Sequence, residues 1–236
     1  MIKLYQFPRM MGVPNAGPYC LKLETWLKMA GLDYEVVSLG DPRKAPKGKL
    51  PYIVDGENTV ADSRLAIEYL EKTYAVDLDA NLSDREKAVA HALAIMLEEH
   101  YYWGLLYNRW IDENWTQVKK IFFSALPPIV KNFVPGLIQK GVKDSLHAQG
   151  LGRHDAATVY RLVNQDMHAL SVLMGDNPFV MGAEPTTIDA MAYGLLANVL
   201  NTPMDSPLKQ FVQQRPNLVA FTNRMTQRYY PDFAAC

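Results

Sequence analysis

The sequence predicts a chain in two parts, a small mixed α/β domain followed by an all-helical domain. Within residues 1–76, short apolar segments of strand length alternate with helical patterns. From Ser83 onward, strand patterns nearly disappear and long helical repeats replace them. The length of 236 residues allows two domains, because one domain typically has roughly 100–200 residues. We therefore expect domains at residues 1–76 and 84–236.

The first part begins with a strand, a helix and a second strand. Residues 2–7 are short, apolar and aromatic, as in a buried strand, and a loop rich in Pro and Gly follows. Residues 19–30 carry Leu, Trp and Ala at helical spacing, and Gly31 is placed to end this helix. Residues 34–39 alternate apolar and polar side chains, which predicts the second strand.

A hairpin and a helix complete this part. Residues 50–54 predict a third strand, the Asp-Gly pair at 55–56 is typical of a hairpin turn, and residues 59–61 return beside the third strand. Apolar side chains at helical spacing over residues 63–74 predict a second helix. The order β-α-β and then β-β-α is the thioredoxin-like arrangement of a small mixed sheet with helices.

Pro51 stands inside the third predicted strand, where a proline has no N–H to donate to its neighbour. A cis bond between Leu50 and Pro51 at a ligand-facing turn is one solution, and a trans proline in an edge strand is the other. Cis bonds make up only about 5–6% of X-Pro bonds. The position after a βαβ unit and before a hairpin nevertheless favours the cis form.

The second part has helical patterns throughout. Ser83 and Glu86 have the spacing of a capping box at the start of a long helix. A later helix, capped by Thr186 or Thr187, carries no charge over residues 190–200, so we expect it at the centre of the helical core. The Pro-Pro pair at 127–128 must break or kink the chain. We expect helices at residues 84–107, 115–123, 130–148, 156–174, 186–200 and, as one helix or a pair, 211–229.

Composition excludes several classes of protein. The formal net charge of -1 removes the basic surface expected of a general nucleic-acid binder. Cys20 and Cys236 are too few for a disulfide framework, and no histidine has metal-ligand spacing, so we expect no metal. We find no secretory signal and no apolar run that approaches a membrane span, and we expect a cytoplasmic protein. Three prolines in the basic amphipathic stretch at residues 119–143 disfavour contact with a membrane surface.

Five short motifs follow one another along the chain. They are Gly-Pro-Tyr-Cys-Leu-Lys at residues 17–22, Lys-Gly-Lys-Leu-Pro at 47–51, Ala-Asp-Ser at 61–63, Gln-Gly-Leu-Gly-Arg-His at 149–154 and Pro-Thr-Thr-Ile-Asp-Ala at 185–190. In this order they resemble the glutathione transferase superfamily over essentially the whole chain. The run at 149–154 is more particular to the branch that contains metaxins, failed-axon-connections proteins and their bacterial relatives.

The resemblance implies a homodimer whose thioredoxin-like domain binds glutathione and whose helical domain holds a small hydrophobic electrophile. Leu50, beside a cis-Pro51, would offer its backbone to the cysteinyl part of glutathione, as an added strand does. Asp62 and Ser63 would hold the ammonium group and the carboxylate of the γ-glutamyl end, and Gly17 would lie against the same ligand. Without the resemblance, Asp62 and Ser63 are equally consistent with a plain helix N-cap.

The sequence does not decide which residue supports the glutathione thiolate. In relatives, a Ser, Tyr or Cys near the start of the first helix supports the glutathione thiolate, where the positive helix end lowers a thiol pKa. Here that position falls on Gly17, which has no side chain. Asn15 and Tyr19 are substitutes, through an amide N–H or a hydroxyl directed at the sulfur. Cys20 is either a working thiol or, as is more common, a packed small hydrophobe.

The first long helix of the second part is rich in aromatic side chains. We take His100, Tyr101 and Trp103 as contacts with the acceptor substrate, because aromatics with one polar tip suit such a pocket. Core packing and dimer contact are the alternative for most of them. Tyr5 and Tyr52 are further candidates to support the thiolate, although strand tyrosines usually lie in the core.

An enzyme is the leading hypothesis: a glutathione transferase for detoxification that conjugates a small hydrophobic electrophile, or reduces it with glutathione. Such a protein lowers the thiol pKa and positions the acceptor, while the nucleophile belongs to glutathione. A non-catalytic binding or scaffold module is the alternative, and the missing catalytic Ser or Cys favours it.

Overall fold

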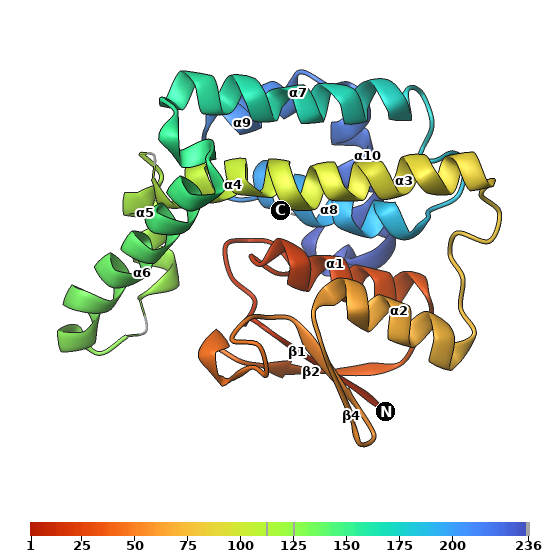
Figure 1. The fold of residues 1–236 in the computed structure, drawn as a ribbon, viewed down its shortest axis with the longest axis horizontal. Coiled ribbons are helices and arrows are strands. Elements are labelled where there is room, and N and C mark those ends of the chain that lie inside the picture. The colour runs from red at the N-terminus through yellow and green to blue at the C-terminus, as the bar shows by residue number, and fades with distance from the viewer. Residues whose placement is uncertain (112, 125, 235–236) are drawn as a thin grey trace.

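The computed structural model describes residues 1–111, 113–124 and 126–234. A sheet with two helices forms the N-terminal part, and a stack of helices covers it (Figure 1). Cys236 lies outside the described residues. No helix within the described residues has the length and apolar character needed to cross a membrane.

The sheet has four strands in the order β2-β1-β3-β4 within the described residues. Strand β1 (Ile2–Gln6) pairs in parallel with β2 (Tyr34–Ser38) and antiparallel with β3 (Tyr52–Asp55). Strand β3 in turn forms a hairpin with β4 (Asn58–Ala61). The predicted β-α-β, β-β-α order and the thioredoxin-like mixed sheet are confirmed.

Helices α1 (Pro18–Met29) and α2 (Ser63–Tyr74) cover one face of this sheet. Side chains alternate between the two faces of a strand, so Leu4 and Ile53 point to the helices and join a buried cluster with Trp26. Gly31 follows the end of α1 with φ of 65°, a left-handed conformation that glycine adopts without strain. The predicted end of this helix is confirmed.

The opposite face of the sheet carries a pair of stacked tyrosines. The rings of Tyr5 and Tyr52 lie 4.3 Å apart between centroids. Ala45 and Leu50, from the loop that contains the short helix η1 (Pro42–Lys44), pack into the same cluster. These two tyrosines therefore have the core role that is usual for strand residues.

Helices fill the remainder of the described chain, and the last predicted segment is a pair. They are α3 (Asp84–Met96), the π-helical turn η2 (Leu97–Tyr101), α4 (Tyr102–Trp110), α5 (Trp115–Phe122), α6 (Pro128–Gln149), η3 (Leu151–Arg153), α7 (Ala156–Met174), α8 (Thr187–Leu200), α9 (Pro207–Gln213), α10 (Pro216–Tyr229) and η4 (Pro231–Phe233). The division into domains at 1–76 and 84–236 stays a prediction, although the structure changes from mixed to helical at the same place.

Two details differ from the sequence-based expectations. The helix expected over residues 84–107 is interrupted by the π-helical turn η2, which local sequence patterns do not predict. Helix α6 begins at Pro128, earlier than expected, because a proline fits the first turn of a helix. Pro135 lies inside α6 and is buried, and the helix continues through it.

Helix α8 is the centre of the helical part, as its lack of charge predicts. The Asp189 carboxylate accepts hydrogen bonds from the Thr186 N–H at 2.7 Å and from the Thr186 hydroxyl at 2.9 Å, which caps the helix. Every residue from Ile188 to Val199 is buried. At Gly194, an added Cβ would lie 2.6 Å from the carbonyl oxygen of Pro18, so α8 and α1 approach each other at backbone distance.

We predict that Gly194→Ala lowers the free energy of unfolding by about 2 kcal/mol, because the new methyl group must push α1 away from α8. Gly141→Ala on α6 is the control, since nothing lies within 4 Å of its added Cβ. It should be neutral or stabilising by up to about 1 kcal/mol, because Ala is the better helix former. Urea denaturation of both variants measures this, and equal effects would contradict the close approach.

Candidate functional site

The register of the hairpin brings two predicted binding segments together. Tyr52 lies opposite Ala61, so Leu50 and Pro51 leave β3 at the edge where Asp62 follows β4. The bond between Leu50 and Pro51 is cis. The cis interpretation is confirmed and the trans alternative is wrong. Because β1 also ends at this edge, with Tyr5 opposite Tyr52, the loop before α1 starts here too.

Asp62 caps helix α2 at this edge. Its Oδ1 atom accepts a hydrogen bond from the backbone N–H of Arg64 at 2.8 Å and a longer one from Leu65 at 3.4 Å. Asp62 has φ of 91°, and its side chain is exposed. Ser63 is buried in the first turn. The N-cap role is confirmed, and the exposed carboxylate stands beside the positive end of α2.

Asn15 holds the loop that leads into α1. Its Nδ2 group donates to the Phe7 carbonyl at 2.8 Å, and its Oδ1 atom accepts from the Gly17 N–H at 2.9 Å. The side chain is fully buried. Both ends of the amide have loop partners, so the geometry opposes the prediction that Asn15 donates to a thiolate.

Gly17 stands where side chains already fill the space. An added Cβ would lie 3.0 Å from the Phe7 ring, 3.2 Å from Asn15 Oδ1 and 3.2 Å from Cys20 Sγ. A larger residue at Gly17 would therefore displace a neighbour. Packing against these neighbours therefore explains why residue 17 carries no nucleophilic side chain.

Tyr19 ties α1 to the helical part. Its hydroxyl donates to the Glu98 backbone carbonyl at 2.8 Å, across the contact with η2. Burial, then the negative charge of nearby groups, raises the pKa of Tyr19 far above its usual value. The proton of Tyr19 is thus committed to a structural hydrogen bond, which opposes its predicted role at the thiolate.

Of the two interpretations of Cys20, the structure supports the packed small hydrophobe. Its side chain is buried, and this burial raises the pKa of the thiol to about 12. A thiol of that pKa is almost entirely protonated at neutral pH, and only the thiolate is nucleophilic. The structure therefore argues against Cys20 as a working thiol.

Arg109 is a candidate that sequence reasoning missed. This buried side chain donates from Nη1 to the Ala16 carbonyl at 2.6 Å and from Nη2 to Asn198 Oδ1 at 2.6 Å. Its Nε atom is buried without a hydrogen-bond partner among the described residues. Burial lowers the pKa of Arg109 to about 10, so the side chain stays charged at neutral pH. A positive charge therefore lies beneath the start of α1.

Tyr102 contacts α1 and is near enough to feel the Arg109 charge. Its ring packs edge-on against Tyr19, with centroids 4.8 Å apart, and the side chain is partly exposed. Burial raises the pKa of Tyr102 to about 12, while the charge of Arg109 opposes this rise. Sequence reasoning placed Tyr102 only in an aromatic cluster, because nothing local predicts which face of a helix meets α1.

The three predicted substrate contacts do not share one place. His100 Nδ1 lies 2.6 Å from Asp166 Oδ2, so it faces α7. Tyr101 is fully buried, and its hydroxyl has no hydrogen-bond partner within the described part of the chain. Trp103 is half-buried and packs against the helical core. Tyr101 is therefore a core residue, which corrects its predicted role as a substrate contact.

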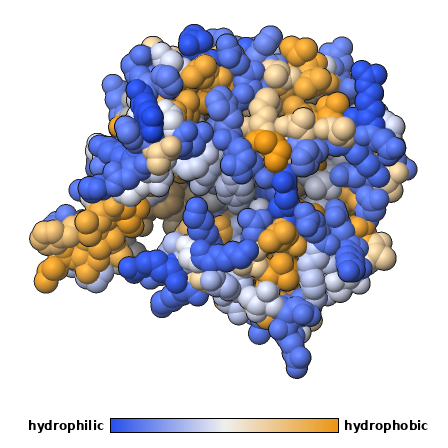
Figure 2. All heavy atoms as spheres, in the orientation of Figure 1, coloured by the Kyte–Doolittle hydropathy of each residue, from blue (hydrophilic) through white to orange (hydrophobic). Residues whose placement is uncertain are grey.

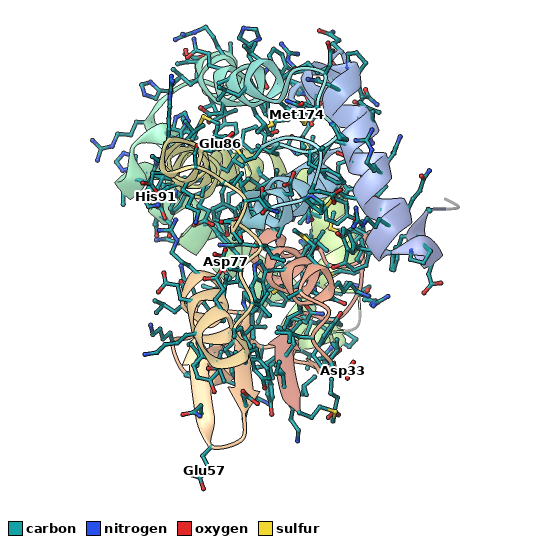
Figure 3. The ribbon with its side chains drawn as sticks, turned by 90° about the vertical axis from the view of Figure 1, so that its right-hand side faces the viewer. Asp33, Glu57, Asp77, Glu86, His91 and Met174 are labelled. Atoms are coloured by element: carbon teal, nitrogen blue, oxygen red, sulfur yellow. The ribbon has the colours of Figure 1, made fainter. Side chains whose placement is uncertain are left out.

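Charged side chains line a cleft of about 240 Å³ where α1 and α2 face α3 and α8. Lys22 Nζ and Glu98 Oε1 form a buried ion pair at 2.5 Å, and Arg64 lies 3.8 Å from the other Glu98 oxygen. Figure 3 shows Asp77 in the connection between the two parts, with the hairpin tip at Glu57 at the opposite end of the molecule from the helical part. No group of three or more potential metal ligands occurs in residues 1–111, 113–124 and 126–234.

Comparison with known proteins identifies the family. Residues 18–115 match the model of the glutathione S-transferase N-terminal domain, and residues 163–225 match the model of the glutathione S-transferase C-terminal domain. An isoprene-epoxide–glutathione S-transferase of Rhodococcus sp. strain AD45 is 32% identical over 97% of this chain and 99% of its own length. The chain belongs to the glutathione S-transferase family.

Other relatives of this transferase-family chain carry different names. Failed axon connections of Drosophila melanogaster is 33% identical over 99% of the chain, which spans only 59% of that protein. A metaxin-1 homolog of Caenorhabditis briggsae is 28% identical over 98% of the chain and 74% of its own length. The predicted resemblance to this branch is confirmed.

The fold has solved counterparts. A β-etherase from Sphingobium sp. strain SYK-6 superimposes with a TM-score of 0.70, covering 98% of each chain at 19% identity. At this identity the likeness concerns the fold alone. The predicted architecture, a thioredoxin-like sheet followed by an all-helical part, is therefore that of the transferase family.

We predict that the Cys20 thiol reacts slowly in the native protein. In a Cys236→Ser variant Cys20 is the only cysteine. A pKa of about 12 leaves roughly one thiolate in 10⁵ at pH 7, and burial blocks access of the reagent. Labelling with an aromatic disulfide should be at least about a hundredfold slower in buffer than in urea. Equal rates would show an accessible thiol and contradict this account.

Proposed function

We propose that this protein binds glutathione at the sheet edge and conjugates it to a small hydrophobic electrophile. The observation that carries this proposal is the cis Leu50–Pro51 bond beside Asp62 and Ser63 at the start of α2. Leu50 lies outside the paired residues of β3, so its backbone groups at this edge can pair with a ligand in extended conformation.

The γ-glutamyl end of glutathione fits the start of α2. A carboxylate is stabilised by the free N–H groups and positive dipole of a helix N-terminus, which Ser63 opens. An ammonium group is attracted by the Asp62 carboxylate, whose side chain is exposed. These two charges of opposite sign on one ligand match the two adjacent residues.

We assign the thiolate to the start of α1, with Tyr102 as the hydrogen-bond donor. Gly17 has no side chain to act, and Asn15 and Tyr19 are held by other partners. The Arg109 charge beneath the helix start favours an anion there and acts together with the helix dipole. The Arg109 charge and the Tyr102 hydroxyl therefore supply the electrostatic environment that lowers the thiol pKa of bound glutathione.

An epoxide is one acceptor class that fits this chemistry, and the Rhodococcus relative is named for such a substrate. The sulfur of the bound thiolate forms a bond to one ring carbon, the bond from that carbon to the oxygen breaks, and the alkoxide takes a proton from solvent water. Glutathione-dependent reduction is the second reaction of the same thiolate. Four points stay predictions: the identity of the acceptor, the cytoplasmic location, a role in detoxification and the homodimer.

We predict that Asp62→Asn weakens glutathione binding and leaves folding intact. Asn is as good an N-cap as Asp, so α2 remains capped, but the charge that attracts the ammonium group is lost. Loss of a hydrogen bond to a charged group raises the dissociation constant by about 10-fold to 100-fold. Titration calorimetry with glutathione measures it.

The control for this measurement is Asp155→Asn, which changes the N-cap of α7 in the same way. Its affinity for glutathione should equal that of the unchanged protein. Equal affinities in both variants would contradict the role of Asp62, and no binding in the unchanged protein would contradict the site itself.

We predict that Tyr102→Phe lowers kcat/KM for a chromogenic aryl halide about tenfold or more, because less of the bound glutathione is ionised once the donor to its thiolate is lost. Glutathione affinity measured at acidic pH, where the bound thiol is protonated, should stay the same, while the ultraviolet absorbance of the bound thiolate should titrate at higher pH. Tyr74→Phe is the control, since this partly exposed hydroxyl donates to Asp55 instead. An unchanged titration in Tyr102→Phe would rule out Tyr102 as the donor.

A non-catalytic binding module is the second candidate function, and the crowded Gly17 position favours it. The sequence departs from the family's usual catalytic Ser, Tyr or Cys at this place, and no larger side chain fits there without displacing Phe7 or Asn15. Glutathione binding without turnover of any aryl halide or epoxide would support this module over the enzyme.

A further inference from the structure

Helix α6 presents an apolar surface to solvent. Five large apolar side chains on it are exposed, three of them by about two-thirds or more: Ile129 (78%), Val130 (37%), Phe133 (69%), Leu137 (68%) and Ile138 (41%). We call this set the α6 apolar face. In Figure 2 the corresponding arm at the left of the molecule is strongly hydrophobic, and Figure 1 shows that α6 extends away from the rest of the fold.

The α6 apolar face is not the packed side of the helix. Ile129, Phe133 and Leu137 are spaced four residues apart, so they form one continuous stripe. Pro135 and Leu146 are the buried residues of α6 and lie on another side. Gln139 anchors this packed side through a hydrogen bond from Nε2 to the Trp110 carbonyl at 2.7 Å.

Basic side chains accompany this face on α5 and α6. Residues 115–149 contain five lysines and one acidic residue, Asp144, although the whole chain has a net charge of -1. Asp144 is paired with Lys140 at 2.7 Å. Lys119, Lys120 and Lys143 are exposed on α5 and α6. The charge of this arm is therefore complementary to an anionic surface.

The α6 apolar face is too small to form a stable protein interface by itself. A standard interface uses about 20–30 residues on each side, and the α6 apolar face offers five side chains over residues 129–138. A few apolar side chains with flanking lysines are instead enough to lie in the headgroup region of a membrane. The prolines that disfavoured this interpretation in the sequence do not interrupt the face, because Pro128 begins α6 and Pro135 is buried.

We propose that the α6 apolar face inserts shallowly into an anionic lipid surface, with the lysines of α5 and α6 at the headgroups. The contact is peripheral and reversible, and it needs no spanning helix. It is independent of the glutathione site, because none of its residues contributes to the sheet edge or to the start of α1. Failure of one proposal therefore leaves the other standing.

The test is sedimentation of the full chain with vesicles of phosphatidylcholine alone or mixed with phosphatidylglycerol. We expect binding to the anionic vesicles, weak binding to the neutral ones, and release by high salt. Phe133→Asp with Leu137→Asp should lower the partition coefficient at least about tenfold, because each apolar side chain loses its burial. Lys119→Gln, Lys120→Gln and Lys143→Gln together should abolish the preference for anionic lipid.

Two matched controls separate the α6 face from general effects. Val172→Asp with Leu173→Asp places the same charges on exposed apolar positions of α7, and it should bind vesicles like the unchanged protein. Lys44→Gln, Lys47→Gln and Lys49→Gln remove three exposed charges from another loop and should keep the lipid preference. Thermal unfolding of every variant should match the unchanged protein, because all these positions lie at the surface.

Three results would overturn the proposal. The first is no binding of the unchanged protein to anionic vesicles. The second is an equal loss of binding in the α6 and α7 variants. The third is a dimer, measured by analytical ultracentrifugation without lipid, that Phe133→Asp dissociates, since the occupant would then be a second copy of the chain.

Discussion

The contact between α1 and α8 is the constraint on which the rest of the structure depends. Gly194 brings the backbone of α8 against Pro18, the first residue of α1, and no side chain larger than hydrogen fits between them. Asn198, one turn later on α8, donates to the Asn15 carbonyl at 3.1 Å and accepts from Arg109. The start of α1 is thus positioned by the helical part as much as by the sheet.

Because of this contact, residues from both the N-terminal part and the helical part form the candidate site. The sheet edge supplies the cis Leu50–Pro51 bond and the capped start of α2. The helical part supplies Arg109 and Tyr102 at the start of α1. Unpaired buried charge is costly, and the Arg109 charge is stabilised there by the carbonyl oxygens of Ala16 and Asn198 and by the Asn198 amide oxygen. The electric field of Arg109 therefore favours an anion at the start of α1.

The local parts of this structure were predictable, and the long-range parts were not. Gly31, the hairpin, the cap at Asp62 and the capping box at Ser83 each depend on residues within a few positions, and all are confirmed. Tyr19 bonds a carbonyl 79 positions away, and Arg109 bonds one 93 positions away. Local sequence patterns do not predict such pairs, so the predicted role of Tyr19 at the thiolate could not be judged before its partner was known.

The central claim is that glutathione lies extended along the cis-Pro51 edge with its sulfur at the start of α1. The most direct measurement is a crystal structure with a glutathione S-alkyl conjugate. The account predicts the glutamyl carboxylate at the Ser63 N–H, its ammonium group at Asp62, and the sulfur within hydrogen-bond reach of the Tyr102 hydroxyl. A conjugate bound elsewhere, for example in the cleft lined by Lys22 and Glu98, would contradict it.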